Sequence, residues 1–271
     1  MRRLIAFDCE RDRLAATLDS APGAAGLLIV SGGNELRIGA GRGMAMLAAA
    51  IAACGAPVFR YDRRGVGDST GSNRGFARSR DDLIAAAAAF RAAAPHVTCL
   101  LGFGNCDGAT TLALHGAAAG VDALLLANPW LVEPAGDAPP AAAIRARYAD
   151  RLADPAQWLR LLRGGVDLRK LAGGLRTLLR PAPPTGDLAS QVATALHRHP
   201  LPTTLLLARR DNTAIACAAA WRTPTFEPIR ARVPVIERDT ASHGFLHDDD
   251  PEWLIEQVAA ALARLEAGAV A

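Results

Sequence analysis

Lysine is nearly absent from this sequence: Lys170 is the only one among 30 basic residues, and the others are all arginine. The basic residues oppose 27 acidic ones, and a formal net charge of +3 is too small to indicate a nucleic-acid-binding protein without a localised basic patch. The five cysteines are widely spread and none forms a C-x-x-C pair. This spacing argues against a disulfide framework and against a structural zinc site.

Long hydrophobic runs are missing as well. Gly and Pro interrupt the uncharged stretches before they reach the roughly 20 residues of a membrane-spanning helix. Charged residues between Asp8 and Arg13 leave no room for the apolar segment of a signal peptide. We therefore expect a cytoplasmic protein with reduced cysteines, which neither inserts into a membrane nor binds nucleic acid.

Short apolar segments alternate with helical segments along most of the chain. Its 271 residues are 51% hydrophobic and 21% charged, enough to bury a sizeable core. Residues 1–20 alternate like a β-hairpin with its turn at Glu10–Arg13. Beyond them the pattern predicts strands at 27–30, 57–61, 97–101, 122–127, 203–208 and 233–238, and helices at 42–54, 81–94, 107–118, 213–221 and 251–265. The alternation predicts an α/β fold with a mostly parallel sheet flanked by helices.

This pattern breaks at Asn128-Pro129-Trp130, and residues 130–185 contain only helical pieces. We therefore expect a core of residues 1–129 and 186–271, with 130–185 inserted as a helical cap. Between residues 141 and 180 the cap has nine basic and three acidic side chains. Such a cap could receive an anionic substrate, for example a coenzyme A or carrier-protein thioester or an acidic glycan. The alternative is an ordinary solvated helical face.

The most informative motif is Gly104-Asn105-Cys106-Asp107-Gly108, between an expected strand and an expected helix. It is the G-x-S-x-G nucleophile elbow with cysteine in place of serine. The turn presents Cys106 at a helix N-terminus, where the positive end of the helix dipole favours a thiolate. The alternative is a small buried cysteine in a tight turn. A carboxylate at Asp107 disfavours the thiolate, and the sequence offers no reason for it.

A nucleophile of this kind needs a histidine base, and His243 is the first candidate. It lies in the loop after the strand expected at 233–238, beside Gly244. His247 is the second candidate, although its acidic neighbours resemble a solvated helix N-terminus. The other four histidines lie before or inside expected helices: His96, His115, His197 and His199. A surface loop histidine is the alternative for His243.

The acid that would orient the histidine is Asp211, directly after the strand expected at 203–208. Its alternative role is that of a helix N-cap before Thr213. Asp239 lies only four residues from His243, an awkward position from which to reach the far ring nitrogen. Cys106, Asp211 and His243 occur in the chain order nucleophile, acid, histidine, each at the end of a separately inferred strand.

The oxyanion hole would be formed by two backbone N–H groups. One belongs to Asp107, and the other to Gly33 or Asn34 in the glycine-rich loop after the strand at 27–30; we favour Asn34. An ordinary glycine-rich turn is the alternative. The loop at 62–71 contains G-x-G but lacks the third glycine of a dinucleotide-binding loop, and it is expected to be structural. We expect no cofactor and no metal.

Together these residues resemble the α/β-hydrolase superfamily over almost the whole chain. More narrowly, four segments resemble the exosortase A system-associated hydrolase 1 family: Gly32-Gly33-Asn34-Glu35 with Arg37, Asp62-Arg63-Arg64-Gly65, Gly104-Asn105-Cys106-Asp107 and Asn128-Pro129-Trp130. This resemblance implies a hydrolase fold, a cysteine nucleophile and a link to bacterial exopolysaccharide and protein-sorting systems. It implies no particular substrate.

We therefore expect a hydrolase of esters or thioesters that acts on a small-molecule or carrier-linked acyl substrate. Two alternatives remain open. The same three residues could pass the acyl group to a glycan hydroxyl, or the fold could be a catalytically idle binding module.

Overall fold

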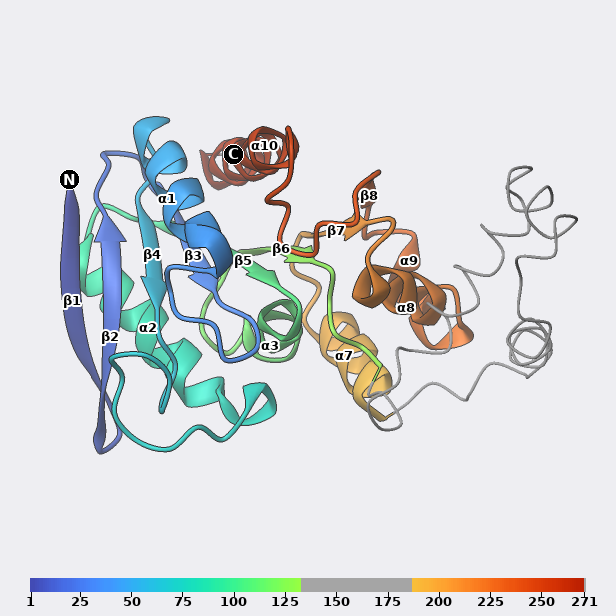
Figure 1. Cartoon of the computed structure of the whole chain (residues 1–271), viewed down its shortest axis with the longest axis horizontal. Helices are drawn as coiled ribbons and strands as arrows, with labels where there is room; N and C mark the ends of the chain where they lie inside the picture. Colours follow the sequence, from blue (N-terminus) through green and yellow to red (C-terminus); the bar gives the residue numbers. More distant parts are fainter. Residues whose placement is uncertain (133–186, 271) are drawn as a thin grey trace, which may run out of the picture.

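The protein is described by a computed structural model that covers residues 1–132 and 187–270 (Figure 1). These residues form an eight-stranded sheet in the order β1-β2-β4-β3-β5-β6-β7-β8. The strands are β1 (Arg2–Cys9), β2 (Asp12–Asp19), β3 (Ala25–Val30), β4 (Val58–Tyr61), β5 (Cys99–Asn105), β6 (Ala123–Ala127), β7 (Thr203–Ala208) and β8 (Val235–Arg238). The predicted α/β fold with a mostly parallel sheet is confirmed.

The expected hairpin is the antiparallel edge of this sheet. In it β1 pairs with β2 over the full length of both strands, from Arg2 opposite Asp19 to Cys9 opposite Asp12. β2 pairs antiparallel with β4, and every pairing from β4 through β8 is parallel. The parallel strands therefore end at one common edge, where the loops that carry the candidate site residues lie.

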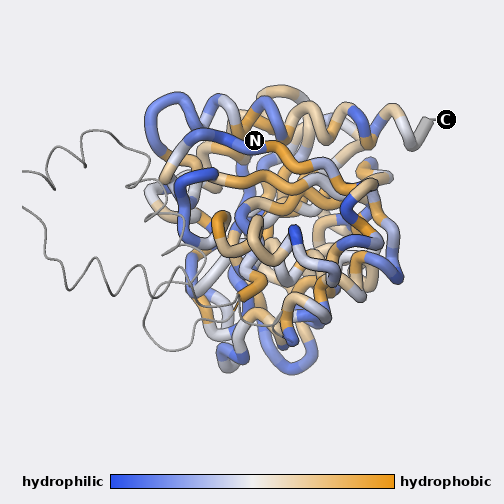
Figure 2. The backbone as a smooth tube through the Cα atoms, turned by 90° about the vertical axis from the view of Figure 1, so that its right-hand side faces the viewer, coloured by the Kyte–Doolittle hydropathy of each residue, from blue (hydrophilic) through white to orange (hydrophobic). Residues whose placement is uncertain are grey.

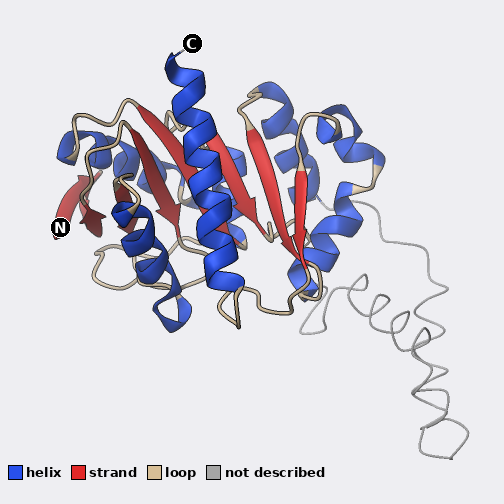
Figure 3. Ribbon diagram, turned by 90° about the horizontal axis from the view of Figure 1, so that it is seen from above, coloured by secondary structure: helices blue, strands red, loops and turns tan. Residues whose placement is uncertain are grey.

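Helices cover both faces of the sheet. They are α1 (Gly43–Ala53), α2 (Arg80–Ala93), α3 (Asp107–His115), α7 (Asp187–Arg198), α8 (Asn212–Trp221), α9 (Glu227–Arg230) and α10 (Asp250–Val270), with short 3-10 turns η1 (Ala40–Arg42), η2 (Phe76–Arg78) and η3 (Pro224–Phe226). Helices α1 and α10 lie side by side on one face, and α2, α3 and α7 lie on the other (Figures 1 and 3).

The core lies between these layers. All six residues of β3 and all five of β6 are buried, as expected for parallel strands covered on both faces. Figure 2 shows this distribution as apolar strands at the centre and polar loops outside. Between β4 and α2, the rings of Phe59 and Phe90 stack with their centroids 5.2 Å apart.

The elements that differ from the expectations include β5 and α7. β5 continues to Asn105, whereas the sequence pattern ends the strand at 101. Gly102 and Gly104 lie beyond the expected strand, but they are strand residues over which α3 packs: a Cβ on Gly102 would lie 2.8 Å from Leu112 Cδ2, and one on Gly104 would lie 2.6 Å from the Gly108 carbonyl carbon. Helix α7 was not assigned, although its buried residues Leu188, Val192 and Leu196 have helical spacing.

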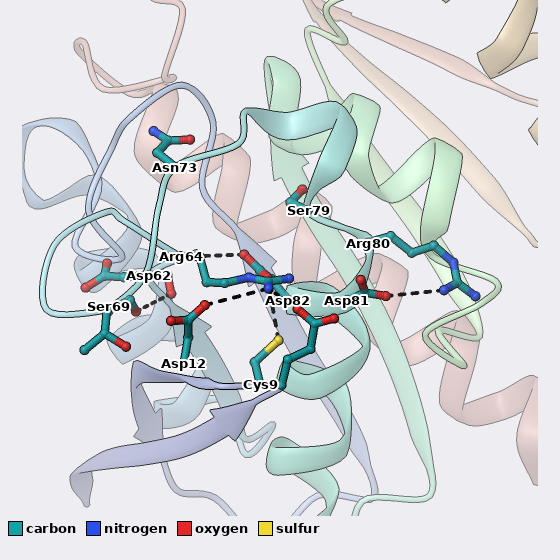
Figure 4. Close-up of polar contacts among 12 residues, drawn as sticks. Cys9, Asp12, Asp62, Arg64, Ser69, Asn73, Ser79, Arg80, Asp81 and Asp82 are labelled. Atoms are coloured by element: carbon teal, nitrogen blue, oxygen red, sulfur yellow. Dashed lines mark hydrogen bonds and ion pairs between the residues drawn. The ribbon is translucent and has the colours of Figure 1, made fainter.

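The loop after β4 is tied to the hairpin and to α2 by buried charges (Figure 4). Arg64 donates through Nε to Asp82 Oδ1 at 2.5 Å and through its backbone N–H to Asp82 Oδ2 at 2.9 Å, and its Nη1 pairs with Glu10 at the hairpin turn. Cys9 of β1 also contacts Asp82, with Sγ 3.6 Å from Oδ1. The contacts of this loop are those expected of a structural element.

The expected cap at 130–185 falls outside the described residues apart from Trp130, Leu131 and Val132, so the prediction of a helical cap stays a prediction. Among the helices that the structure describes, none is both long enough and apolar enough to cross a membrane.

Candidate active site

Cys106 lies at the sharp turn between β5 and α3, where it is the N-cap residue of the helix. Its φ of 57° and ψ of −126° lie in a region that costs a non-glycine residue about 1–3 kcal/mol, so the surroundings must enforce it. Close backbone contacts on both sides explain how. A Cβ on Gly108 would lie 2.4 Å from the Val30 carbonyl oxygen, and one on Gly32 would lie 2.5 Å from the Asn105 carbonyl oxygen.

Asp211 lies directly after β7 and contacts His243. The Oδ2 atom of Asp211 is 3.0 Å from His243 Nδ1, and it also accepts the backbone N–H groups of Thr213 at 2.9 Å and Ala214 at 3.0 Å. Asp211 is therefore both the N-cap of α8 and the partner of the histidine, the two roles that the sequence left open. Burial raises the pKa of Asp211, but the hydrogen bonds from His243 and from the two N–H groups outweigh burial and lower it.

The other candidates for these two roles lie elsewhere. Asp239 is exposed and forms ion pairs with Arg209 at 3.1 Å and Arg210 at 3.2 Å. His247 is exposed near the start of α10. The structure thus places Asp211, and not Asp239, beside His243.

His243 lies between Asp211 and Cys106, with 38% of its side chain exposed. Burial alone would lower its pKa, but the hydrogen bonds and charges of Asp211 and Cys106 raise the pKa of His243 to about 10. The imidazole is therefore protonated at neutral pH. An imidazolium in contact with a sulfur can hold that sulfur as a thiolate, or later return the proton to a leaving group.

The loop of His243 is held by hydrogen bonds on both sides. Thr240 donates through Oγ1 to Asp250 Oδ2 at 2.6 Å and accepts the backbone N–H of Ser242 at 3.0 Å. Ser242 in turn accepts the backbone N–H of Leu246 through Oγ at 2.8 Å. These contacts fix the loop against the start of α10, so the backbone of His243 is held in place and its side chain points in a defined direction.

The glycine-rich loop after β3 meets the first turn of α3 through Asp107. The backbone N–H of Gly33, not that of Asn34, donates to the Asp107 carboxylate. The Asn34 side chain faces the loop after β4, where its Oδ1 accepts from Asn73 Nδ2 at 2.7 Å and from Arg63 Nη2 at 3.4 Å. Burial raises the pKa of Asp107, against the opposing effect of the Gly33 hydrogen bond and the Arg63 charge. Asp107, unexplained from the sequence, therefore joins the two elements whose N–H groups are the oxyanion-hole candidates.

Sequence reasoning noted Asn128 as the point where the strand pattern breaks and as part of a segment that resembles a known family, but it gave Asn128 no role in the site. Asn128 follows β6, is fully buried, and donates through Nδ2 to the carbonyl oxygen of His243 at 2.8 Å. Its position directly after an apolar strand is the signal that the sequence offers, whereas its positive φ of 43° belongs to the folded backbone. In residues 1–132 and 187–270, no group of three or more His, Cys, Asp or Glu side chains could hold a metal ion.

Solved structures of several hydrolases share this fold. The esterase Pf2001 of Pyrococcus furiosus superposes with a TM-score of 0.65 at 14% identity, covering 98% of this chain and 91% of the esterase. Proline iminopeptidase of Mycobacterium smegmatis gives 0.63 at 17% identity, covering 98% and 100%. Est1E of Butyrivibrio proteoclasticus, solved with ferulic acid bound, gives 0.61 at 15% identity, covering 97% and 99%. A comparison with curated proteins finds no match.

At these identities the structural likeness establishes the fold alone. A sequence model described as "Alpha/beta hydrolase family" matches residues 27–257, from β3 into α10. The matched range includes the elbow at Cys106 and the loops of Asp211 and His243. With most of its length accounted for by that model, the chain belongs to the alpha/beta hydrolase family.

Proposed function

We propose that this alpha/beta hydrolase cleaves ester or thioester bonds with Cys106 as nucleophile, His243 as acid and base, and Asp211 as the group that orients and charges the imidazole. The observation that carries the proposal is the 3.0 Å contact between His243 Nδ1 and Asp211 Oδ2, on a histidine near enough to Cys106 for that cysteine to raise its pKa. Since Nδ1 of His243 contacts Asp211, the other ring nitrogen is available to Cys106 Sγ.

The first half of the reaction forms a thioester. Cys106 Sγ attacks the acyl carbonyl carbon, a new carbon–sulfur bond forms, and the bond to the leaving group breaks as His243 donates its proton to that group. Since His243 carries a proton at neutral pH, its part in this half is that of an acid. The backbone N–H of Asp107, with that of Asn34, would receive the developing negative charge on the carbonyl oxygen, because the Gly33 N–H already donates to the Asp107 carboxylate.

The second half releases the acyl group to water. Neutral His243 takes a proton from the attacking water, the carbon–sulfur bond breaks, and the acid product leaves with the thiolate and imidazolium restored. Asp211 keeps the imidazole oriented in both halves and lowers the free energy of its charged form. A sulfur nucleophile suits substrates with good leaving groups, so we place thioesters, activated esters and strained lactones before amides.

The setting of the reaction is also a proposal. Resemblance in the four segments around the site supports a link to bacterial exopolysaccharide and protein-sorting systems, and the charge and cysteine pattern supports a cytoplasmic location. The substrate would be a small-molecule or carrier-linked acyl compound. Nucleic acid is not expected as a partner.

The test is alkylation of each cysteine by iodoacetamide as a function of pH, read by mass spectrometry. Cys54 is exposed and lies between the end of α1 and the start of β4, whereas His243 follows the end of β8, so Cys54 is an internal reference; Cys9, Cys99 and Cys217 are buried. We expect Cys106 to react faster than Cys54 at pH 6–7 in the wild type and to lose that advantage in His243→Ala. Equal rates for the two cysteines, unaffected by His243→Ala, would refute the enzyme and favour the idle binding module.

Hydrolysis itself is measured with p-nitrophenyl acetate and with a short-chain acyl thioester. We expect both activities to disappear in Cys106→Ala. If a glycan added to the assay takes the acyl group in preference to water, the same three residues serve an acyltransferase.

A further inference from the structure

Asn128 occupies the point where β6 ends beneath the candidate site. Its side chain is fully buried, at 0% exposure, and its φ is 43°. Among non-glycine residues, asparagine is one of the few that adopts a positive φ readily. A polar side chain buried this deeply requires hydrogen-bond partners for its amide oxygen and nitrogen.

Those partners lie on three different segments. The amide oxygen accepts the backbone N–H of Ala208, the last residue of β7, at 2.8 Å. The amide nitrogen donates to the carbonyl oxygen of His243 at 2.8 Å and to the side-chain oxygen of Asn105, the residue before Cys106, at 3.2 Å. One amide group therefore joins the segments that carry Cys106, Asp211 and His243.

The residues on either side of Asn128-Pro129 also form backbone hydrogen bonds with Cys106 at the turn between β5 and α3. The N–H of Cys106 donates to the carbonyl oxygen of Ala127 at 3.0 Å, and the carbonyl oxygen of Cys106 accepts the N–H of Trp130 at 3.2 Å. Thr110 on α3 donates through Oγ1 to the Trp130 carbonyl oxygen at 2.8 Å. Both sides of the Cys106 backbone are thus held by the two residues that flank Asn128-Pro129.

We propose that Asn128 is a positioning residue that sets the separation of Cys106 and His243 by tying the backbone of His243 to the end of β5 and the end of β7. The inference rests on the proposed function, because it assigns a role in the geometry of that same site. Asn128 has no contact with a reacting atom in the proposed mechanism. It acts through the His243 carbonyl and through Asn105.

The amide is the group that this position requires. Ala208 presents a donor, whereas His243 and Asn105 both present acceptors, so the position needs one acceptor and two donors in one planar group. An aspartate of the same shape would keep the contact with Ala208 but place a carboxylate against two oxygens. The imidazole would then move away from the elbow, while the sheet beneath keeps its core.

The test compares Asn128→Asp with the wild type and with Ile51→Val. Ile51 is buried in α1, away from the strand ends that carry the site, so Ile51→Val controls for loss of stability alone. For folded Asn128→Asp we expect kcat to fall about 10- to 100-fold, the effect of a displacement of order 1 Å in a catalytic group, with KM nearly unchanged. We also expect the iodoacetamide reactivity of Cys106 to drop toward that of Cys54.

A spectroscopic readout separates positioning from stability. In the wild type the imidazole signals of His243 should titrate near pH 10, and in Asn128→Gly, which removes the amide without adding a charge, we expect the midpoint to fall toward the usual value of about 6.5 as the contacts with Asp211 and Cys106 loosen. Ile51→Val should keep the wild-type midpoint and kcat. If Asn128→Asp does not fold, Asn128→Gly, which suits the positive φ and removes all three side-chain contacts, takes its place in the same measurements.

The outcomes are distinguishable. Wild-type kinetics and titration in a folded Asn128 variant would overturn the inference and leave the proposed function standing. Failure of both Asn128 variants to fold, with Ile51→Val folded, would also overturn it, because the role would then be purely structural. Failure of the proposed function itself would be seen in the wild type, where Cys106 and Cys54 would be alkylated at equal rates.

Discussion

The N–H of Gly33 donates a hydrogen bond to the carboxylate of Asp107, and this contact joins the loop after β3 to the first turn of α3. The same carboxylate lies beside the candidate nucleophile and adds a negative charge to a site that is meant to form a thiolate. Asp107 therefore has two effects of opposite value for the proposed reaction. It holds the loop that carries the candidate oxyanion-hole N–H groups, and it opposes negative charge on Cys106.

Substitutions at Asp107 can separate these two effects. Asp107→Asn keeps an acceptor for the Gly33 N–H but removes the charge, so we expect alkylation of Cys106 at pH 6–7 to become several-fold faster. Asp107→Ala removes the acceptor as well, and we expect hydrolysis to fall and the free energy of unfolding to drop by about 1 kcal/mol, the net value of one hydrogen bond. Slower alkylation in Asp107→Asn would contradict this account.

The two roles of Asp211 can be separated in the same way. Asparagine is as good an N-cap as aspartate, so Asp211→Asn should keep α8 intact while removing the charge from His243. We expect Asp211→Asn to lose about 100-fold or more in kcat, as triads do when the orienting carboxylate is lost. Asp211→Ala should lose a further ~1 kcal/mol of stability from the missing cap, measured by urea unfolding. Equal stability of the two variants would argue against the cap.

Stability should also depend on pH through this pair. The pKa of His243 in the folded protein is raised above its unfolded value of about 6.5, so the contribution of the imidazolium is fully present below that pH and is lost as the pH rises toward about 10. The pKa of Asp211 is lowered, so its contribution is present above its unfolded value of about 3.9 and is lost as the pH falls through the lowered value.

The difference in unfolding free energy between the wild type and Asp211→Asn should accordingly be largest between about pH 4 and pH 6.5 and should shrink toward pH 10. Chemical denaturation at a series of pH values measures it. A difference that grows from neutral to alkaline pH would have the wrong sign for a protonated His243.

The sequence predicted the elements that have a strong local pattern. β3 and β6 are unbroken apolar runs, and their burial on both faces follows from that. The end of β5 was misplaced because Gly102 and Gly104 read as loop residues, whereas they are needed where α3 packs on the strand. Glycine occurs both in loops and in strands under a closely packed helix. The sequence alone does not distinguish the two cases, because the distinction depends on whether a helix packs against the glycine.

The site was predictable to the extent that it lies at strand ends. Asp211 and His243 follow β7 and β8, which is why both could be proposed from the sequence. The link from Asn128 to His243 spans 115 residues and has no local pattern, so no periodicity could reveal it. The sequence also could not show that the Gly33 N–H donates to Asp107, because the direction of that N–H is a property of the folded loop.

A last prediction concerns the ion pairs of Figure 4, which contrast a buried pair with an exposed one on neighbouring residues of α2. The side chains of Arg64 and Asp82 are each 4% exposed, whereas those of Arg80 and Asp81 are 54% and 49% exposed. Breaking a buried pair from one side leaves an uncompensated charge and costs about 3–5 kcal/mol, while an exposed pair contributes about 0–1 kcal/mol.

We therefore expect Asp82→Ala to lower the unfolding free energy by about 3 kcal/mol and Asp81→Ala to change it by less than about 1 kcal/mol. Urea denaturation of the two variants measures the contrast. Folded Asp82→Ala should retain the alkylation rate of Cys106, because Arg64 and Asp82 connect the hairpin to α2 and do not contact His243. Similar losses in the two variants would mean that Glu10 and Asp12 suffice to compensate the Arg64 charge, since Arg64 Nη1 pairs with Glu10 and lies 3.8 Å from Asp12 Oδ2.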